Sequence, residues 1–258
     1  MIQLRMMLED KPLNMLYDQF ILDFKMEIDR ANVNCEYFGY EMIIKKEYIV
    51  PLVITTKKYL LDVLGIEIAD IDIVGYYESY ELPINHSIHV QIDEQCGFNI
   101  RGFYDLESKT IYVKIGEHFK ILMPTLFHEL THAYIHTKNI KIIDDFPMPT
   151  QICFDFASLM HKASQEEGLC ELVSTLMSYH IFDINQYPSN IDKYWLGWRL
   201  CMEGFLTFAK MIIYQFKDKD NLWITRLSFI SLINQLKQNN NLYKFVNMVP
   251  KDAYNKTK

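Results

Sequence analysis

The segment His128-Glu129-Leu130-Thr131-His132 constrains this chain more than any other, because it can present two imidazoles and a carboxylate to one metal ion. Residues four apart on an α-helix lie on one face, about 6 Å apart along the axis, so His128 and His132 can bind a single cation. Glu129 lies one step round that face, where it can reach a metal-bound water as a general base. The pattern predicts a zinc site on a helix.

The residues around this motif favour the same interpretation. No Gly or Pro interrupts residues 126–136, and the residues next to the two histidines, apart from Glu129, are uncharged, as expected of a helix that lines a dry cleft. Pro124 is expected in the first turn of this helix, where a missing N–H is tolerated. The alternative is a half-buried helix that carries two hydrogen-bonded histidines.

A second acidic segment, Glu166-Glu167-Gly168-Leu169-Cys170-Glu171, is expected on a later helix that begins at Ser164. A carboxylate from this helix would give the metal three protein ligands and leave the fourth position for water, as in catalytic zinc sites. The two motifs together resemble those of the gluzincin metallopeptidases, in which H-E-x-x-H is followed by a glutamate ligand. The similarity is closest to the peptidase domain of the ubiquitin-activated growth-regulating peptidases.

This resemblance implies a role for each matching residue. His128, His132 and Glu167 would bind one Zn2+ ion, and Glu129 would be the general base. Glu171, one helical turn after Glu167, would hydrogen-bond a ligand histidine and fix its tautomer. The implied protein is a zinc metallopeptidase, a hydrolase that cleaves peptide bonds of a protein or peptide.

The third ligand has alternatives. Glu166 is the first substitute for Glu167, and Ser164 with Glu167 also spells a capping box, in which the glutamate would only cap its own helix. His136 continues the four-residue spacing, but two turns separate it from His128 by about 12 Å, so one ion cannot hold all three histidines. We therefore interpret His136 as a surface or rim residue.

The order of periodic segments predicts an α+β fold of zincin type. Apolar residues at helical spacing indicate helices over residues 13–30 and 46–64, and a period of two indicates strands near residues 71–73 and 88–92. Residues 98–104 and 110–115 are expected to form a hairpin, which gives a small, mostly antiparallel sheet. Segment 110–115 or its hairpin partner is the candidate edge strand for an extended substrate, the alternative being an ordinary sheet edge.

The remaining segments complete the predicted domains. Residues 138–163 form an insertion, a loop followed by a helix over residues 150–163, which could act as a lid or specificity wall. Residues 167–182 are expected to complete the glutamate helix that begins at Ser164. A metallopeptidase core thus spans residues 1–183, and a helical C-terminal lobe spans residues 184–258.

Composition excludes several classes of function. A net charge of −7 and a pI near 5.6 argue against nucleic acid as a partner, since phosphate neutralisation needs a basic surface. The five scattered cysteines suit a reducing compartment without a disulfide framework. The N-terminus lacks the apolar run of a signal peptide. The sequence has no run of 18 uninterrupted apolar residues, which a membrane-spanning helix would need. We expect a cytoplasmic protein.

Two alternatives to a peptidase of this kind stay open. One resembles the short intracellular metallopeptidases that clip a repressor, although their E-x-x-A-N segment is not seen here. The other is a non-catalytic zinc-containing interaction module. A peptidase would also need a donor to the oxyanion, for which Tyr179 and His180 are the candidates on the glutamate helix.

Overall fold

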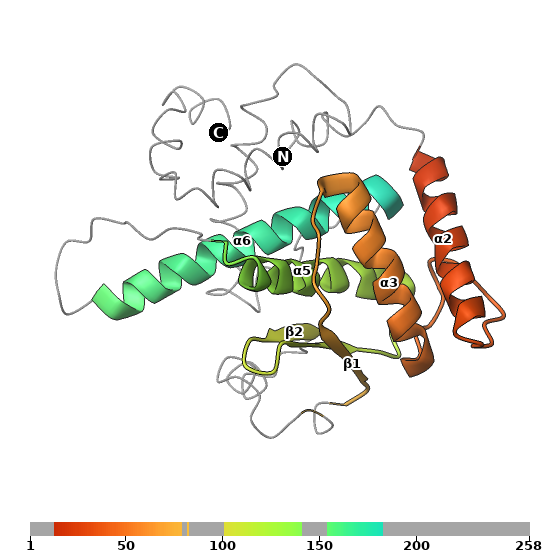
Figure 1. The fold of residues 1–258 in the computed structure, drawn as a ribbon, viewed down its shortest axis with the longest axis horizontal. Coiled ribbons are helices and arrows are strands. Elements are labelled where there is room, and N and C mark those ends of the chain that lie inside the picture. Colours follow the sequence, from red (N-terminus) through yellow and green to blue (C-terminus); the bar gives the residue numbers. More distant parts are fainter. Residues whose placement is uncertain (1–12, 79–81, 83–100, 141–153, 183–258) are drawn as a thin grey trace, which may run out of the picture. The chain divides into compact units, whose positions relative to one another are not determined.

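The structure is a computed structural model, which describes residues 13–78, 82, 101–140 and 154–182 (Figure 1). The chain divides into two compact units. One unit comprises residues 12–137 and 173–186, and nearly all of the described elements belong to it. The other comprises residues 1–11, 138–172 and 187–258, of which the structure describes residues 138–140 and 154–172. The predicted C-terminal lobe lies outside the described residues.

The first predicted helix is confirmed as α2, Leu13–Arg30. Its buried side chains, Phe20, Phe24 and Ile28, are spaced four apart and so form one apolar stripe. Phe20 and Phe24 are fully buried, and Phe20 packs edge-on against Tyr59 with ring centroids 4.9 Å apart. The stripe at helical spacing is therefore core, as the sequence predicts.

The second predicted helix is confirmed as one helical run in three parts. A 3-10 turn, η1 (Lys46–Tyr48), leads into α3 (Ile49–Tyr59), which ends in a π-helical turn, η2 (Leu60–Leu64). Gly65 follows with φ 73°, and the N–H of Ile66 donates to the carbonyl of Leu60. This left-handed cap explains why the run stops at a glycine.

The described sheet has three strands in the order β1-β3-β2. These are β1 (Asp72–Tyr76), β2 (Gly102–Asp105) and β3 (Thr110–Lys114). β2 and β3 form the predicted antiparallel hairpin, whereas β1 pairs with β3 in parallel. The prediction of a mostly antiparallel sheet is therefore wrong for the described strands, because period two reveals a strand but not its neighbours.

This order decides between the two predicted candidates for the substrate edge among the described strands. β3 lies between β1 and β2, so segment 110–115 is central among the described strands, and its hairpin partner β2 lies at the edge. Parallel pairing needs a long connection, which residues 77–109 supply. The strand predicted near residues 88–92 lies outside the described residues.

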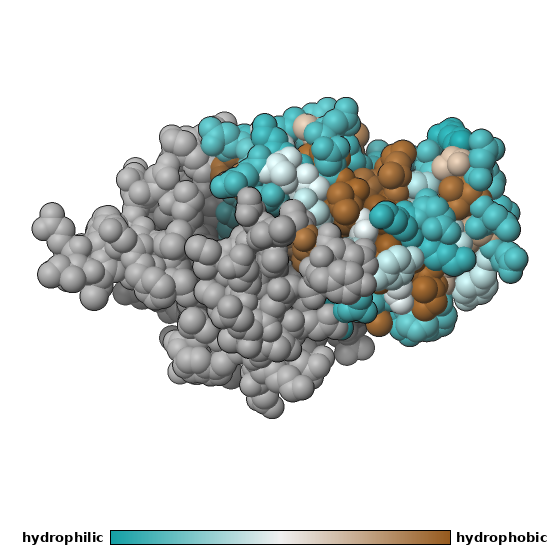
Figure 2. Space-filling model, turned by 90° about the horizontal axis from the view of Figure 1, so that it is seen from below, coloured by the Kyte–Doolittle hydropathy of each residue, from teal (hydrophilic) through white to brown (hydrophobic). Residues whose placement is uncertain are grey.

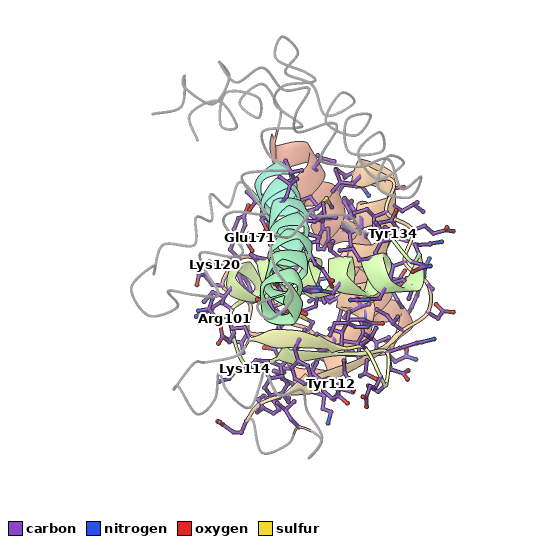
Figure 3. All side chains as sticks on the ribbon, turned by 90° about the vertical axis from the view of Figure 1, so that its left-hand side faces the viewer. Arg101, Tyr112, Lys114, Lys120, Tyr134 and Glu171 are labelled. Carbon is purple, nitrogen blue, oxygen red and sulfur yellow. The ribbon has the colours of Figure 1, made fainter. Side chains whose placement is uncertain are left out.

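The two faces of the sheet differ. Ile111 and Val113 of β3 are fully buried, whereas Tyr112 and Lys114 are half-buried and lie on the side away from α5 (Figure 3). Phe103 stacks on Tyr112 with ring centroids 4.8 Å apart. The alternation of side chains thus reserves the other face of the sheet for the helix that carries the histidine motif.

That helix is α5, Phe119–Thr137, which covers the inner face of β2 and β3 (Figure 1). It begins earlier than predicted, so Pro124 is an interior residue rather than part of the first turn. A proline there cannot donate to the carbonyl of Lys120, which costs helix stability. Burial of Phe119, Leu122 and Met123 offsets this cost and so stabilises the turn that precedes Pro124.

The last described helix is α6, Phe154–Phe182. It runs without a break where the sequence predicts two helices, because no proline separates them and Gly168 is tolerated inside a helix. Ser164 therefore lies within the helix, and the interpretation of Ser164 and Glu167 as a capping box is wrong. Residues 173–182 of α6 belong to the same unit as α5. There the Ser174 hydroxyl donates a hydrogen bond of 2.8 Å to the Pro124 carbonyl. Phe182, at the end of the helix, is buried.

The outer surface of the described part mixes hydrophilic and hydrophobic side chains (Figure 2). Large apolar side chains that are exposed on the helices include Leu22, Val50 and Ile54. No helix within the described residues combines the length and apolarity needed to cross a membrane.

Candidate metal centre

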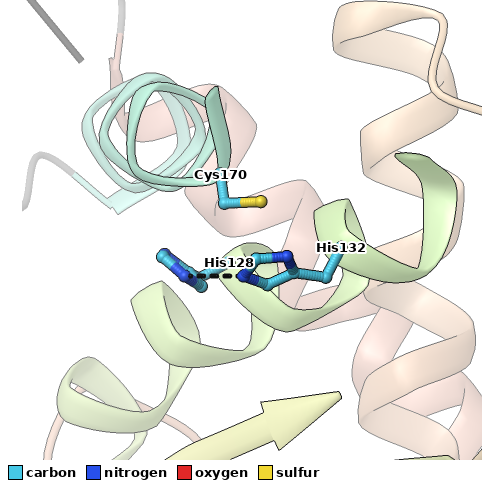
Figure 4. A group of neighbouring side chains, drawn as sticks. All are labelled: His128, His132 and Cys170. Atoms are coloured by element: carbon cyan, nitrogen blue, oxygen red, sulfur yellow. Dashed lines mark hydrogen bonds between the residues drawn. The ribbon is translucent and has the colours of Figure 1, made fainter. Parts of the chain in front are cut away.

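Two histidines one turn apart on α5 form the centre of the site (Figure 4). The Nε2 atoms of His128 and His132 are 3.2 Å apart, and the ring centroids are 5.0 Å apart at an interplanar angle of 61°. Both residues are half-buried. The helix thus brings one nitrogen of each ring to a common point, as the four-residue spacing predicts.

The distance between the two Nε2 atoms is close to the ligand–ligand distance in a tetrahedral zinc site. Two nitrogens bound tetrahedrally at roughly 2.1 Å from one ion are about 3.4 Å apart. The observed 3.2 Å is close to that edge length. It is also a hydrogen-bond distance, in which one ring would carry its proton on Nε2. The arrangement therefore suits both a shared metal ion and a hydrogen-bonded histidine pair. A measurement of metal binding distinguishes these two interpretations.

Glu129 lies between the histidines in sequence but is more deeply placed than they are. Its exposed fraction is 7%, while the neighbouring Leu126, Phe127 and Leu130 are fully buried. A carboxylate held in a nearly dry environment interacts more strongly with a nearby charge than one in water. Glu129 is one residue after His128 and three before His132, the place in the motif that is expected of a general base.

The structure holds residue groups that could bind a metal ion. Within the described residues, the ligand atoms of His128, His132 and Cys170 lie within 4.8 Å of one another, and so do those of His132, His136 and Glu166. Figure 4 shows the first group. Neither group contains all three histidines, in keeping with the length of two helical turns. The identity of the metal is not given by either group.

The helical spacing of α6 explains which of its residues belong to these groups. Glu166, Cys170 and Ser174 are four apart and so form one stripe of the helix. Ser174 is the residue that donates to Pro124 of α5. Cys170 and Glu166 precede Ser174 on the same stripe of this unbroken helix.

Glu167 and Glu171 form the adjacent stripe of α6, and both are half-buried. Glu167 belongs to neither of the two groups among the described residues. The roles implied by the resemblance, ligand for Glu167 and hydrogen-bonding partner for Glu171, stay predictions. The predicted substitute, Glu166, is a member of the second group.

Two residues of β2 were missed by the sequence reasoning. Tyr104 stacks on His136 with ring centroids 5.8 Å apart, which places His136 against the edge strand. Burial raises the pKa of Tyr104, and so does Asp105, while His132 acts in the opposite direction. Gly102 lies on the same face of β2, against Glu129. The signal was available, since period two puts residues 102 and 104 on one face of the strand before the motif helix.

The predicted oxyanion donors belong to the glutamate helix. Tyr179 and His180 lie in α6, but their side chains are outside the described part of the structure. Tyr104 is the tyrosine that the described residues place beside the histidines.

Comparison with protein-family models, with curated proteins and with solved structures found no match to this chain. The gluzincin family therefore remains a resemblance carried by the two motifs.

Proposed function

We propose that this chain is a zinc-dependent metallopeptidase of gluzincin type, which hydrolyses peptide bonds of a protein or peptide. The observation that carries the proposal is the 3.2 Å separation of the Nε2 atoms of His128 and His132, with Glu129 buried next to them. His128 and His132 provide two ligands, and α6 provides the third. Glu167 is the third ligand by resemblance, with Glu166 as its substitute. Of the two groups of possible ligands, the one with both His128 and His132 contains Cys170, whereas Glu166 is grouped with His132 and His136.

The donor set suits zinc. Imidazole nitrogens with a thiolate or a carboxylate are the common zinc ligands, and three protein ligands leave a position for water or substrate. When bound, zinc would polarise the scissile carbonyl and make water a better nucleophile at neutral pH.

The remaining chemistry belongs to residues of the chain. The Glu129 carboxylate accepts a proton from the attacking water and then passes it to the leaving amine. Glu129 is 7% exposed, and burial of this kind reduces the freedom of the carboxylate that accepts the proton. Tyr104 of β2, whose ring stacks on His136, is a candidate to contact the substrate.

The test is zinc content and peptide turnover in the parent and in Glu129→Gln. Glutamine has nearly the same shape but cannot accept the proton, so the variant should hold the same zinc and lose roughly 10²–10⁴-fold in kcat. A parent that binds zinc but cleaves nothing in a diverse peptide library would instead favour the non-catalytic zinc-containing interaction module. Equal turnover in both proteins would rule out Glu129 as the base.

A further inference from the structure

We propose that Gly102 is a positioning residue for Glu129, because a Cβ atom at this point of β2 would press on Thr125 and on Cγ of Glu129. The proposal rests on the proposed function, since it takes Glu129 as the proton acceptor. The contact itself can be tested without catalysis.

The distances around Gly102 carry the argument. A Cβ atom added there would lie 2.7 Å from Cγ2 of Thr125 and 3.1 Å from Cγ of Glu129. Carbon atoms in unstrained contact are about 3.5–4.0 Å apart. Any side chain at position 102 therefore has to displace one or both of these α5 side chains.

The strand cannot retreat easily from the helix. The same added Cβ would lie 3.1 Å from the carbonyl oxygen of Tyr112, and Gly102 pairs with Val113 in the β2–β3 ladder. Movement of β2 away from α5 would disturb these ladder hydrogen bonds. The strain of an added methyl group therefore falls on Thr125 and Glu129, and Glu129 has little free space because it is almost fully buried.

Gly102 thus leaves room for Cγ of Glu129, the carbon that carries the carboxylate. Thr125 and Glu129 are one turn apart on α5, so β2 packs against the ridge that they form. Two residues along the same face of the strand, Tyr104 packs against His136. Because Gly102 has no side chain, β2 can approach α5 closely at Thr125 and Glu129. Tyr104 contacts His136, one helical turn beyond His132.

The first test is a double-mutant cycle in thermal unfolding of the metal-free protein. Gly102→Ala is compared in the parent and in Glu129→Ala, which lacks the Cγ atom. The matched control is Gly75→Ala in β1, whose added Cβ would lie 3.0 Å from Ile115 Cγ2 and 3.2 Å from Ile49 Cγ1. We expect the fall in Tm caused by Gly102→Ala to shrink in the Glu129→Ala background, and that caused by Gly75→Ala to stay the same. An unchanged fall for Gly102→Ala would overturn the contact.

The second test is kinetic. A displaced carboxylate should lower kcat by roughly 10–100-fold, since a misplacement near 1 Å can cost about that much, while KM and zinc content stay at the parental values. Adding Thr125→Ser to Gly102→Ala removes the methyl group nearest the new Cβ and should restore part of kcat. This double variant also serves if Gly102→Ala alone does not fold.

The outcomes separate the two proposals. If the parent cleaves peptides and Gly102→Ala cleaves them equally well, Gly102 has no positioning role and the peptidase stands. If the parent cleaves none, the proposed function fails, and the unfolding cycle still decides whether Gly102 constrains Glu129.

Discussion

Replacing Phe182, the last residue of α6, by alanine should strongly destabilise the protein. The ring is 2% exposed and contacts Phe20 and Phe119 edge-on, with centroids 5.1 Å and 5.2 Å away. Phe127 lies 6.1 Å away on the same helix as Phe119. These partners come from α2 and α5, whose backbones cannot both move inward to fill the space, so a cavity should remain.

The expected magnitude follows from that burial. A phenylalanine truncated in a core that cannot collapse costs about 3–5 kcal/mol, which should lower Tm by roughly 6–20 °C in a protein of this size. Thermal unfolding followed by circular dichroism measures it. Leu22→Ala is the control, because Leu22 is 51% exposed on α2 and should change stability by less than about 0.5 kcal/mol. A loss for Phe182→Ala as small as that of the control would show that α6 does not end in this aromatic cluster.

Two further predictions concern the acid limb of stability and the third ligand. Burial alone would raise the pKa of Asp23, but hydrogen bonds from Lys58, Gln19 and Tyr59 outweigh it and lower the pKa below its ordinary value of 3.8. The stabilisation from the Asp23 carboxylate is therefore present above pH 3.8 and is lost as pH falls through the lower pKa of the folded protein. Asp23→Asn should consequently reduce the loss of Tm between roughly pH 5 and pH 2. An unchanged dependence of Tm on acid pH would contradict this. Among Glu166→Ala, Glu167→Ala and Cys170→Ala, the variant that removes the third ligand should weaken zinc binding tenfold or more. The Co2+-substituted parent should show a thiolate-to-cobalt charge-transfer band only if Cys170 binds the metal. Equal affinity in all three variants would mean that α6 provides no ligand.

The parts of the fold that depend on local periodicity were predictable. The apolar stripe of α2 and the run from Lys46 to Gly65 follow from helical spacing and a glycine stop, and so does the face shared by His128 and His132. The α5 N-terminus was not predictable from Pro124, because burial of Phe119 on the core outweighs a local breaker.

The parts that depend on pairing between distant segments were not predictable. Nothing in residues 72–76 indicates a parallel partner at residues 110–114, so the position of the sheet edge was open. Likewise, the sequence pattern E-E-G-L-C-E does not reveal which stripe of α6 meets α5. The hydrogen bond from Ser174 to the Pro124 carbonyl shows which stripe does so at Ser174. Cys170 and Glu166 are known only as members of the two groups of possible metal ligands.

Gly102 illustrates a third kind of information. In a sequence, a glycine at the start of a strand indicates only a weak strand former. Its meaning here comes from Thr125 and Glu129, which are adjacent to it only after β2 has packed on α5.

The central claim is that His128 and His132 hold one metal ion together. Its most direct test is the zinc stoichiometry of the metal-free parent, reconstituted and dialysed, beside His132→Ala and His136→Ala. We predict one zinc per chain in the parent and in His136→Ala, and none retained in His132→Ala, because loss of one of two adjacent ligands leaves an incomplete site. A parent that retains no zinc, with the Nε2 atoms joined only by a hydrogen bond, would contradict the metal centre and the peptidase with it.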